Sequence, residues 1–340
     1  MNIIDMHCDT ISAIRYIRKS ASCTLRINSL QIDLEKMKQG GYLLQNFALF
    51  VNLSEEENPM EAALSMVDLY YEELEKNQDM IRPVFSYEDI IRNQADGVMS
   101  ALLTLEEGEI CKGSLENLRN FYRLGARMMT LTWNYENQLG FPNHFPKRSD
   151  YTEDFKPRFA EAYPIWGKPN QKGLKEKGLE FLTEMEKLGM IIDVSHLSDG
   201  GFYDVYEHTS RPFVASHSNA RSLCGNYRNL TDDMIRKMGE RGCVIGLNYF
   251  GNFLSFHPEG HDSKSTMKDI ARHARYIADI GGISCLGLGS DYDGFSGDIE
   301  LSDCSMLPLL EQEFKKQNFS SSDIDKILYQ NVLNLYRDIL

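Results

Sequence analysis

The sequence lacks the features that bind membranes or polyanions. Its longest apolar runs are about strand length, far short of the ~20 residues that a membrane span needs. The formal net charge is −14 and no cluster of basic residues offsets it, so we expect neither nucleic acid nor an anionic membrane surface as a partner. Structure-like sequence begins at Asn2, which leaves no room for a signal peptide and predicts a cytoplasmic protein.

The chain also lacks paired cysteines. Its seven cysteines are scattered, their number is odd, and none forms a C-x-x-C pair. Reduced thiols in a cytosol therefore fit this sequence better than a disulfide framework does.

Three familiar ligand-binding or catalytic motifs are missing as well. The glycine-rich stretch GLGSDYDGF at 287–295 lacks the G-K-[ST] ending of a phosphate loop. Its glycine stands at position 4 of the D-x-D pattern, whereas an EF-hand needs glycine at position 6. No G-x-S-x-G nucleophile elbow occurs. These three interpretations of the sequence therefore fail.

The chain does contain enough apolar sequence for a large core. It has 340 residues, 42% of them hydrophobic, which suits one large domain or two ordinary ones. Short, nearly continuous apolar runs alternate with helical segments, a pattern typical of parallel strands buried on both faces. The eight runs cover 3–5, 43–51, 99–106, 128–133, 189–196, 212–217, 243–249 and 285–291.

Eight strand–helix units predict an α/β fold, namely a single (β/α)8 TIM-type barrel domain over residues 1–340. A doubly wound open sheet is the alternative. Two insertions are expected, near 52–98 and near 134–173. The first is an acidic candidate for a helical hairpin, and the second is rich in aromatics, proline and glycine, as lids and binding loops often are.

Two segments show helical periodicity clearly. Residues 174–189 carry an apolar stripe that includes Phe181 and end at Gly189, a typical helix-terminating residue. Residues 321–340 have one apolar face, and we expect Ser322 to cap this helix.

Polar side chains suited to metal binding or proton transfer stand where the predicted strands end. In a barrel of this type, the C-terminal ends of the strands share one face, where the active site lies. Three of the eight histidines fall at such ends. The residues at strand ends are His7 and Asp9, Glu106 and Glu107, His196, His217, and Asp291 and Asp293.

Each of these residues alone has an ordinary explanation. His196 and His217 could be hydrogen-bonded core or capping histidines, and Asp291 could be a turn residue before Gly294. Glu106 is harder to explain, because a carboxylate that completes an apolar run is costly to bury unless it is paired or binds a cation. Together the residues would require independent coincidences at four or five strand ends, whereas metal binding explains all of them.

The predicted ligand set contains imidazole and carboxylate groups but no cysteine. Such a set suits a catalytic site for Zn²⁺, or for Mn²⁺, Co²⁺ or Fe²⁺. Five ligand groups are too many for one catalytic zinc, which takes three protein ligands and keeps one position open. Two metals that share a bridging carboxylate fit the number better.

Longer motifs around these residues show a resemblance that extends over essentially the whole chain. The sequence resembles the membrane dipeptidase (renal dipeptidase) family of zinc peptidases, whose motifs occur in family order from residue 5 to near residue 295. The motifs are DMHCDT, LEEGE, GARMMTLTWNYEN, GMIIDVSHLS, PFVASHSNARSLCGNYRNLTDD, VIGLNYF and LGLGSDYDG, and NVLNLYRDI near the end also fits.

The resemblance implies a (β/α)8 barrel with two Zn²⁺ ions per chain that hydrolyses dipeptides, including those with a C-terminal D-residue. His7 and Asp9 would then bind one zinc, and His196 and His217 the other. Glu106 would bridge the two ions.

The resemblance also implies two residues that handle the substrate. Arg228 would hold the free carboxylate of the dipeptide, a group that a guanidinium fork fits well. Asp291 would lie near the reacting water and the substrate amine. Relatives of this kind further suggest a homodimer.

Two features depart from the mammalian relatives. Trp133 stands where those relatives carry a histidine that contacts the substrate carbonyl. Trp133 could instead form an aromatic wall of the substrate pocket, and His144 in the following loop is a candidate for the missing histidine's role. The sequence also shows no signal or lipid-anchor segment, unlike the mammalian membrane form.

Three functional hypotheses follow. The first is dipeptide hydrolysis by a hydroxide held between two metals, with Glu106 as bridge, Asp291 as proton-transfer group and Arg228 as selector of dipeptides. The second, motivated by Trp133, is a related binuclear-metal amidohydrolase that acts on N-acyl amino acids or lactones. The third is a small-molecule binder without catalysis, which the complete ligand set disfavours.

Overall fold

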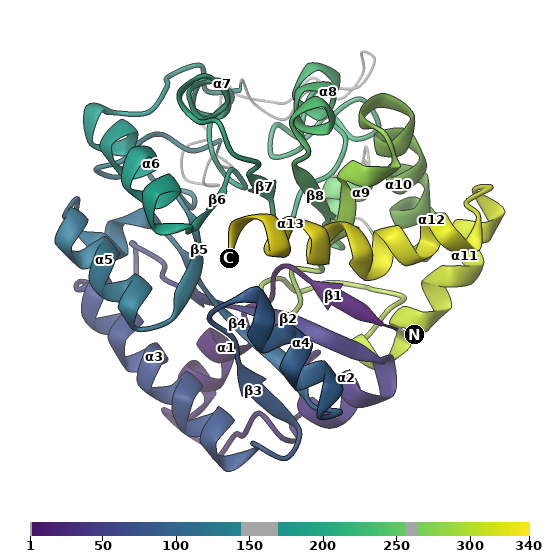
Figure 1. The fold of residues 1–340 in the computed structure, drawn as a ribbon, viewed down its shortest axis with the longest axis horizontal. Helices are drawn as coiled ribbons and strands as arrows, with labels where there is room; N and C mark the ends of the chain where they lie inside the picture. Colours follow the sequence, from purple (N-terminus) through teal and green to yellow (C-terminus); the bar gives the residue numbers. More distant parts are fainter. Residues whose placement is uncertain (1, 144–168, 256–263) are drawn as a thin grey trace, which may run out of the picture.

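A closed ring of eight parallel strands forms the centre of the protein, which is described by a computed structural model over residues 2–143, 169–255 and 264–340 (Figure 1). β2 pairs with both β1 and β4, and β9 pairs with β1 and β8, so the sheet has no open edge within the ring. This closure confirms the predicted (β/α)8 barrel and excludes the open sheet. The ring strands are β1 (Ile3–Asp5), β2 (Tyr42–Phe50), β4 (Met99–Glu106), β5 (Ala126–Thr130), β6 (Ile191–Asp193), β7 (Val214–Ala215), β8 (Val244–Leu247) and β9 (Leu286–Leu288).

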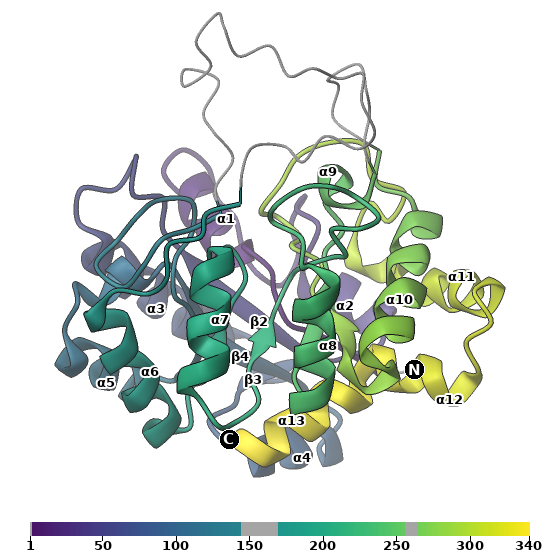
Figure 2. The same ribbon diagram turned by 90° about the horizontal axis from the view of Figure 1, so that it is seen from above.

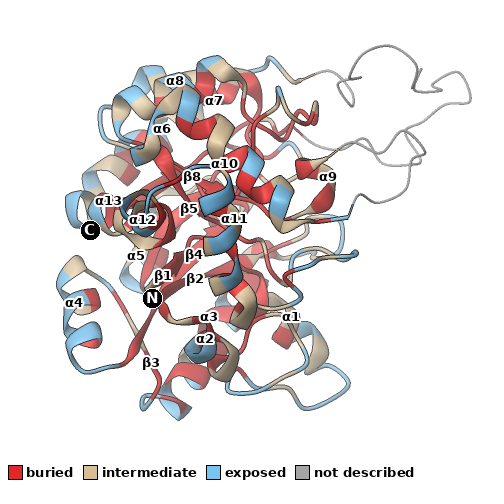
Figure 3. Cartoon of the chain, turned by 90° about the vertical axis from the view of Figure 1, so that its right-hand side faces the viewer, coloured by how far each residue is buried: buried red, intermediate tan, exposed pale blue. Residues whose placement is uncertain are grey.

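Helices surround this ring, with their buried faces turned inward (Figures 1 and 3). Short 3₁₀ segments among the described residues lie at Gly108–Cys111, Ile283–Cys285 and Cys304–Leu309. The helices are α1 (Thr10–Ile17), α2 (Leu34–Gly40), α3 (Pro59–Lys76), α4 (Tyr87–Ala95), α5 (Leu115–Arg123), α6 (Glu176–Leu188), α7 (Asp199–His208), α8 (Asp232–Arg241), α9 (Gly251–Leu254), α10 (Met267–Gly281), α11 (Leu310–Lys316), α12 (Ser321–Asp325) and α13 (Asn331–Ile339), with a π-helical turn at Lys326–Gln330 between α12 and α13.

The helix α13 covers one end of the barrel (Figures 1 and 2). Its residues Val332, Leu335 and Tyr336 pack in one cluster with apolar residues from the first halves of the strands, such as Ile4. The hydroxyl of Tyr336 donates to Asn46 Oδ1 over 2.9 Å. The N-terminal ends of the strands are therefore sealed by apolar packing, which leaves the C-terminal ends for chemistry.

Each predicted apolar run overlaps one barrel strand, but several runs were predicted to be longer than the strands are. β6 ends at Asp193 and β9 at Leu288, before the polar residues that follow. His196 and Asp291 have φ angles of 67° and 64°. A residue in this left-handed region cannot continue an extended strand. The strands stop early because the polar residues at their ends turn the chain.

The insertion near 52–98 differs from the predicted helical hairpin. Between α3 and α4 it contains a ninth strand, β3 (Ile81–Pro83), which pairs in parallel with the start of β4 outside the ring. The insertion is therefore a small helix–strand–helix unit on the flank of the barrel.

The two predicted helices are present, with one change of cap. α6 ends at Leu188 and is capped by Gly189, whose φ of 75° suits a residue without Cβ. The C-terminal helical segment is capped by Ser320 and not by Ser322. The Ser320 hydroxyl accepts from the Asp323 amide over 3.2 Å, and Asp323 accepts from the Ser320 amide over 3.1 Å, a reciprocal capping box.

The second predicted insertion, 134–173, is described only at its two ends. Residues 144–168, and with them His144, lie outside the described residues. Over the part of the chain that the structure describes, no helix has both the length and the apolarity needed to cross a bilayer.

Candidate active site

Six of the eight polar residues predicted at the strand ends meet at the C-terminal end of the barrel, and Glu107 and Asp293 bond elsewhere. Glu106 is the last residue of β4, and one of its oxygens, Oε2, lies 3.3 Å from Nε2 of His7. The other oxygen, Oε1, lies 3.2 Å from Nε2 of His196 and 3.7 Å from Nε2 of His217. One carboxylate thus faces two separate groups of ligands, one with each oxygen.

These contacts define two candidate cation sites that share Glu106. Each has three side chains whose ligand atoms lie within 4.8 Å of one another. We call the group of His7, Asp9 and Glu106 the first cation site, and the group of Glu106, His196 and His217 the second cation site. Asp291 forms a third group of this kind with His7 and His217, and its Oδ1 lies 3.8 Å from His7 Nε2.

Buried polar atoms without hydrogen bonds support a cation at the first site. His7 Nε2, Asp9 Oδ1 and Glu106 Oε2 are all buried and have no hydrogen-bond partner among the described residues. Leaving such atoms unsatisfied is costly, whereas a divalent cation would satisfy all three. The residues present therefore fit a bound metal.

The second site shows the same fit through its histidine pair. The pKa values of His196 and His217 are held well below the usual value by burial, so both rings are neutral. Their Nε2 atoms nevertheless lie only 3.0 Å apart. His217 Nδ1 lies 2.8 Å from the Ser216 hydroxyl, which donates its own proton to Asp193 over 2.5 Å. Because a hydroxyl has only one proton, Ser216 can only accept from His217 Nδ1–H. The Nε2 atom of His217 is then unprotonated, and its lone pair faces the site.

The carboxylates of the cluster carry shifted pKa values. Burial raises the pKa of Glu106 to about 8 and that of Asp291 to about 6, although the positive charge of His7 opposes both shifts. Burial would lower the pKa of His7, but Glu106 and Asp9 outweigh it and raise that pKa well above its usual value. The cluster is thus an acidic, desolvated site that a cation would complement.

Arg228 provides a buried positive charge beside the second cation site. It is 5% exposed, and its guanidinium donates to the Ser218 hydroxyl and the His217 carbonyl, each over 3.2 Å. Its Nε has no hydrogen-bond partner in the part of the chain that the structure describes, and burial lowers the pKa of Arg228 to about 10. Among the described residues, no carboxylate oxygen lies within 4.0 Å of its nitrogens. A buried guanidinium of this kind suits the carboxylate of a ligand.

The loop that carries Arg228 is held by a buried network. Arg221 forms a two-pronged ion pair with Asp199, with both N–O distances 2.7 Å, and also donates to the Tyr227 carbonyl. Asn143 donates to both Asp199 and the Tyr227 carbonyl. These bonds fix the backbone directly before Arg228.

The comparison with known protein families agrees with this geometry. A family model described as membrane dipeptidase, peptidase family M19, matches residues 1–339. The chain belongs to this family. Its members are metallopeptidases, so the protein is a metal-dependent hydrolase.

Individual relatives support the membership. A Klebsiella pneumoniae protein described as an uncharacterized protein in the pqqA 5′ region is 32% identical over 259 residues, which cover 76% of this chain and 89% of that protein. A protein of Aspergillus oryzae named dipeptidase aclJ is 27% identical over 321 residues, 91% of this chain and 70% of the relative. A Rhodobacter sphaeroides metallopeptidase, solved with a phosphinate mimic of the dipeptide L-Ala-D-Ala, superimposes with a TM-score of 0.86 at 23% identity and covers 100% of this chain and 99% of that chain.

Trp133 lies beside the second cation site. The amide of Trp133 donates to Glu107 Oε2 over 2.9 Å. Its indole ring, half-buried, lies 4.7 Å from the Phe50 ring and 6.1 Å from the His196 ring, measured between centroids. This position fits the predicted role as an aromatic wall.

Three supporting residues escaped the sequence analysis. Asn134 lies 3.1 Å from Nδ1 of His196, and Asn248 donates to Asp291 Oδ2 over 3.0 Å. Asp193 accepts from Ser216 behind His217. Their only sequence signal is a polar residue inside or next to a motif, as in TWNYEN and IIDVSH.

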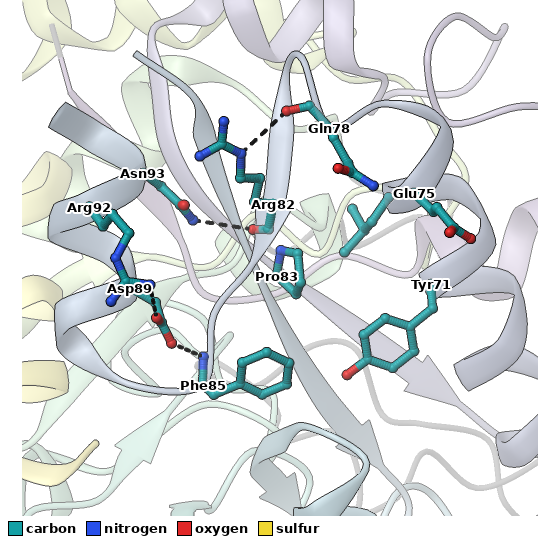
Figure 4. A pocket seen from close by; sticks show the side chains of 10 residues that line it. Tyr71, Glu75, Gln78, Arg82, Pro83, Phe85, Asp89, Arg92 and Asn93 are labelled. Atoms are coloured by element: carbon teal, nitrogen blue, oxygen red, sulfur yellow. Dashed lines mark hydrogen bonds and ion pairs between the residues drawn. The ribbon is translucent and has the colours of Figure 1, made fainter. Parts of the chain in front are cut away.

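A separate cavity of about 530 Å³ lies on the flank of the barrel, between α3, β3 and α4 (Figure 4). It contains none of the predicted site residues. Its arginines are already paired, Arg92 with Asp89 inside the cavity and Arg82 with Asp96 beyond it. We assign it no role in catalysis.

Proposed function

We propose that the protein is a zinc-dependent dipeptidase that binds two Zn²⁺ ions per chain and also cleaves dipeptides with a C-terminal D-residue. The observation that carries the proposal is the position of Glu106, whose two oxygens face two different histidine-containing ligand groups. A carboxylate so placed suits a bridge between two cations.

The donor set supports zinc. It consists of imidazole nitrogens and carboxylate oxygens, which Zn²⁺ accepts, with Mn²⁺, Co²⁺ and Fe²⁺ as alternatives. His7 and Asp9 would hold one ion, His196 and His217 the other, with Glu106 between them. When bound, such ions act as Lewis acids that polarise a peptide carbonyl and make water more acidic.

The chain's own residues then account for substrate selection and proton transfer. Arg228 binds the substrate carboxylate, which places the preceding peptide bond of a dipeptide over the cluster. Asp291 accepts the proton of the attacking water and delivers it to the leaving amine. Asn248 holds Oδ2 of Asp291, which leaves Oδ1 directed at His7 and the cluster.

Cleavage next to a D-residue is supported by the Rhodobacter relative, which was solved with a mimic of L-Ala-D-Ala. An amidohydrolase acting on N-acyl amino acids or lactones is the second candidate. The observation that favours it is Trp133, because this chain has an indole where the mammalian relatives have a carbonyl-binding histidine.

The test is amino-acid release from a panel of L-L dipeptides, L-D dipeptides, N-acetyl amino acids and a lactone. Protein reloaded with Zn²⁺ is compared with chelated protein. We expect metal-dependent cleavage of dipeptides of both configurations. Two bound zinc ions with turnover only of the N-acetyl amino acids or the lactone would contradict the proposal and favour the second candidate.

Three further expectations stay proposals. We infer a single domain over 1–340, a cytoplasmic location and a homodimer, on the sequence features and the resemblance given above. Fractionation of cells and the mass of the purified protein in solution would test the last two.

A further inference from the structure

The side chain of Asn134 lies behind one of the proposed zinc ligands. Its Oδ1 is 3.1 Å from Nδ1 of His196, on the opposite side of the ring from the Nε2 atom that faces Glu106. Asn134 follows Trp133 in the loop after β5. The contact therefore joins this loop to the second cation site.

Hydrogen bonds hold the loop in place on both sides of Asn134. Glu107 is fully buried and accepts from the Trp133 amide over 2.9 Å and from the Asn137 side chain over 2.5 Å. Asn137 also donates to the Leu131 carbonyl over 2.9 Å. The backbone on both sides of Asn134 is thus fixed to the end of β4, the strand that carries Glu106.

The two histidines of the second site need the same tautomer to bind a cation. His217 already has Nδ1–H, because Ser216 can only accept from it. If His196 also has Nδ1–H, the lone pairs of both Nε2 atoms, 3.0 Å apart, face one another and can both bind one cation. If His196 has Nε2–H instead, it donates to His217 and blocks the site.

We propose that Asn134 is a positioning residue that holds His196 in the Nδ1–H tautomer and in the orientation required for the second cation site. Its amide oxygen accepts from Nδ1–H, which leaves Nε2 free as a ligand. The inference rests on the proposed two-cation site, but it concerns the state of His196 before any cation binds.

Nitrogen NMR of the metal-free protein with ¹⁵N-labelled histidine tests the tautomer directly. A His196→Gln variant identifies the ring by its missing signals. We expect the Nδ1–H tautomer of His196 in the wild type and in Asn134→Asp, which keeps an accepting oxygen. Asn134→Leu has a similar volume without an acceptor and should show a mixture or the Nε2–H form. A wild-type ring in the Nε2–H form, or a tautomer that Asn134→Leu leaves unchanged, would overturn the inference.

A zinc titration against a chromophoric chelator gives the second measurement. Asn134→Leu should weaken one of the two zinc sites by roughly 10- to 100-fold, the usual effect of losing the partner of a ligating histidine. The other site should keep its affinity, and Asn134→Asp should bind zinc as tightly as wild type or more so. Glu136→Gln, an exposed residue of the same loop whose partner is Lys175, is the matched control and should change neither site.

The outcomes separate this inference from the proposed function. A wild type that binds no divalent cation contradicts the proposed function, while the NMR experiment still decides the role of Asn134. If Asn134→Leu binds two zinc ions, each as tightly as wild type does, the inference is contradicted and the proposed function stays intact.

Discussion

Glu106 and Glu107 are neighbours in sequence that have separate tasks. Glu106 directs its oxygens at the two cation sites, whereas Glu107 turns away and holds the loop of Trp133. A φ of 114° at Glu107 makes this change of direction possible. Such a backbone angle is costly for a residue with a Cβ and is found where surrounding contacts enforce it, often at functional sites.

The first prediction concerns the bridge. Glu106→Gln keeps the shape of the side chain but removes its negative charge, so we expect fewer than two tightly bound cations per chain. Turnover of dipeptides should fall by more than about 100-fold, beyond what the loss of an outer hydrogen-bond partner costs. Metal analysis and initial rates measure both effects. The control is Glu116→Gln at an exposed position, and a Glu106→Gln protein with two cations and normal rates would refute the role.

The second prediction separates function from stability at Arg228. Arg228→Met should lower kcat/KM for dipeptides by roughly 30- to 5,000-fold, the range for a lost buried charge contact, mostly through KM. The kcat/KM for dipeptide amides, which lack the carboxylate, should fall only slightly. The melting temperature should stay or rise, because the substitution removes a buried charge that has no carboxylate within 4.0 Å among the described residues. Equal losses on dipeptides and their amides would disprove carboxylate binding.

At the scale of elements, the connections after the strands position the site. Asn143 links three of them: its amide donates to the His196 carbonyl over 2.8 Å, and its side chain donates to Asp199 and to the Tyr227 carbonyl. Its Oδ1 accepts from the Asn170 amide over 2.7 Å. One residue thus connects the loop of a proposed zinc ligand with the loop of Arg228.

The third prediction follows from this link. Asn143→Ala should lower the free energy of unfolding by about 2–4 kcal/mol, because buried groups on two loops lose their partners. It should also raise KM for dipeptides while zinc affinity changes little, since Arg228 loses its support and the ligand side chains keep theirs. Urea unfolding and kinetics measure the two effects. Asn334→Ala, at an exposed position in α13, should change neither, and an unaffected KM in Asn143→Ala would contradict the link.

The elements show why the sequence predicts some features and not others. Long apolar strands such as β2 and β4 are visible from composition, because burial on both faces demands it. β3 was missed because three residues with a proline give no such pattern. The clustering of the strand-end residues was predicted because the C-terminal ends of all barrel strands lie at the same end of the barrel. Asn134, Asn143 and Asn248 were not, because their partners lie 27 to 84 residues away and only the folded chain brings them together.

At the scale of the whole molecule, a buried histidine outside the cation sites joins three segments. His273 in α10 accepts from the Ala220 amide over 3.1 Å at Nδ1 and donates to the Leu254 carbonyl over 2.9 Å from Nε2. The bond from the Ala220 amide needs the neutral ring, because a protonated Nδ1 has no lone pair to accept it. Burial lowers the pKa of His273 to about 4.

The fourth prediction is a pH dependence that this histidine causes. The unfolded chain binds a proton at His273 near pH 6.5 and the folded chain only near pH 4, so stability is full above pH 6.5 and is lost as the pH falls to about 4. The loss should reach about 3 kcal/mol. Urea unfolding between pH 7 and pH 4 measures it. His273→Gln, which does not titrate, should flatten this fall, whereas the exposed His208→Gln should keep it; equal curves for both variants would disprove the role.

The helix α13, which covers the N-terminal ends of the barrel strands, also affects how the chain folds during synthesis. Tyr336 bonds to Asn46, which precedes it by 290 residues. At about 5–20 residues per second, the ribosome takes roughly 15–60 s to synthesise the chain between them. During that time no helix covers the apolar residues at the N-terminal ends of the barrel strands. A nascent chain therefore exposes apolar strand residues until α13 leaves the ribosome. A chaperone that binds these residues during synthesis should raise the yield of folded protein.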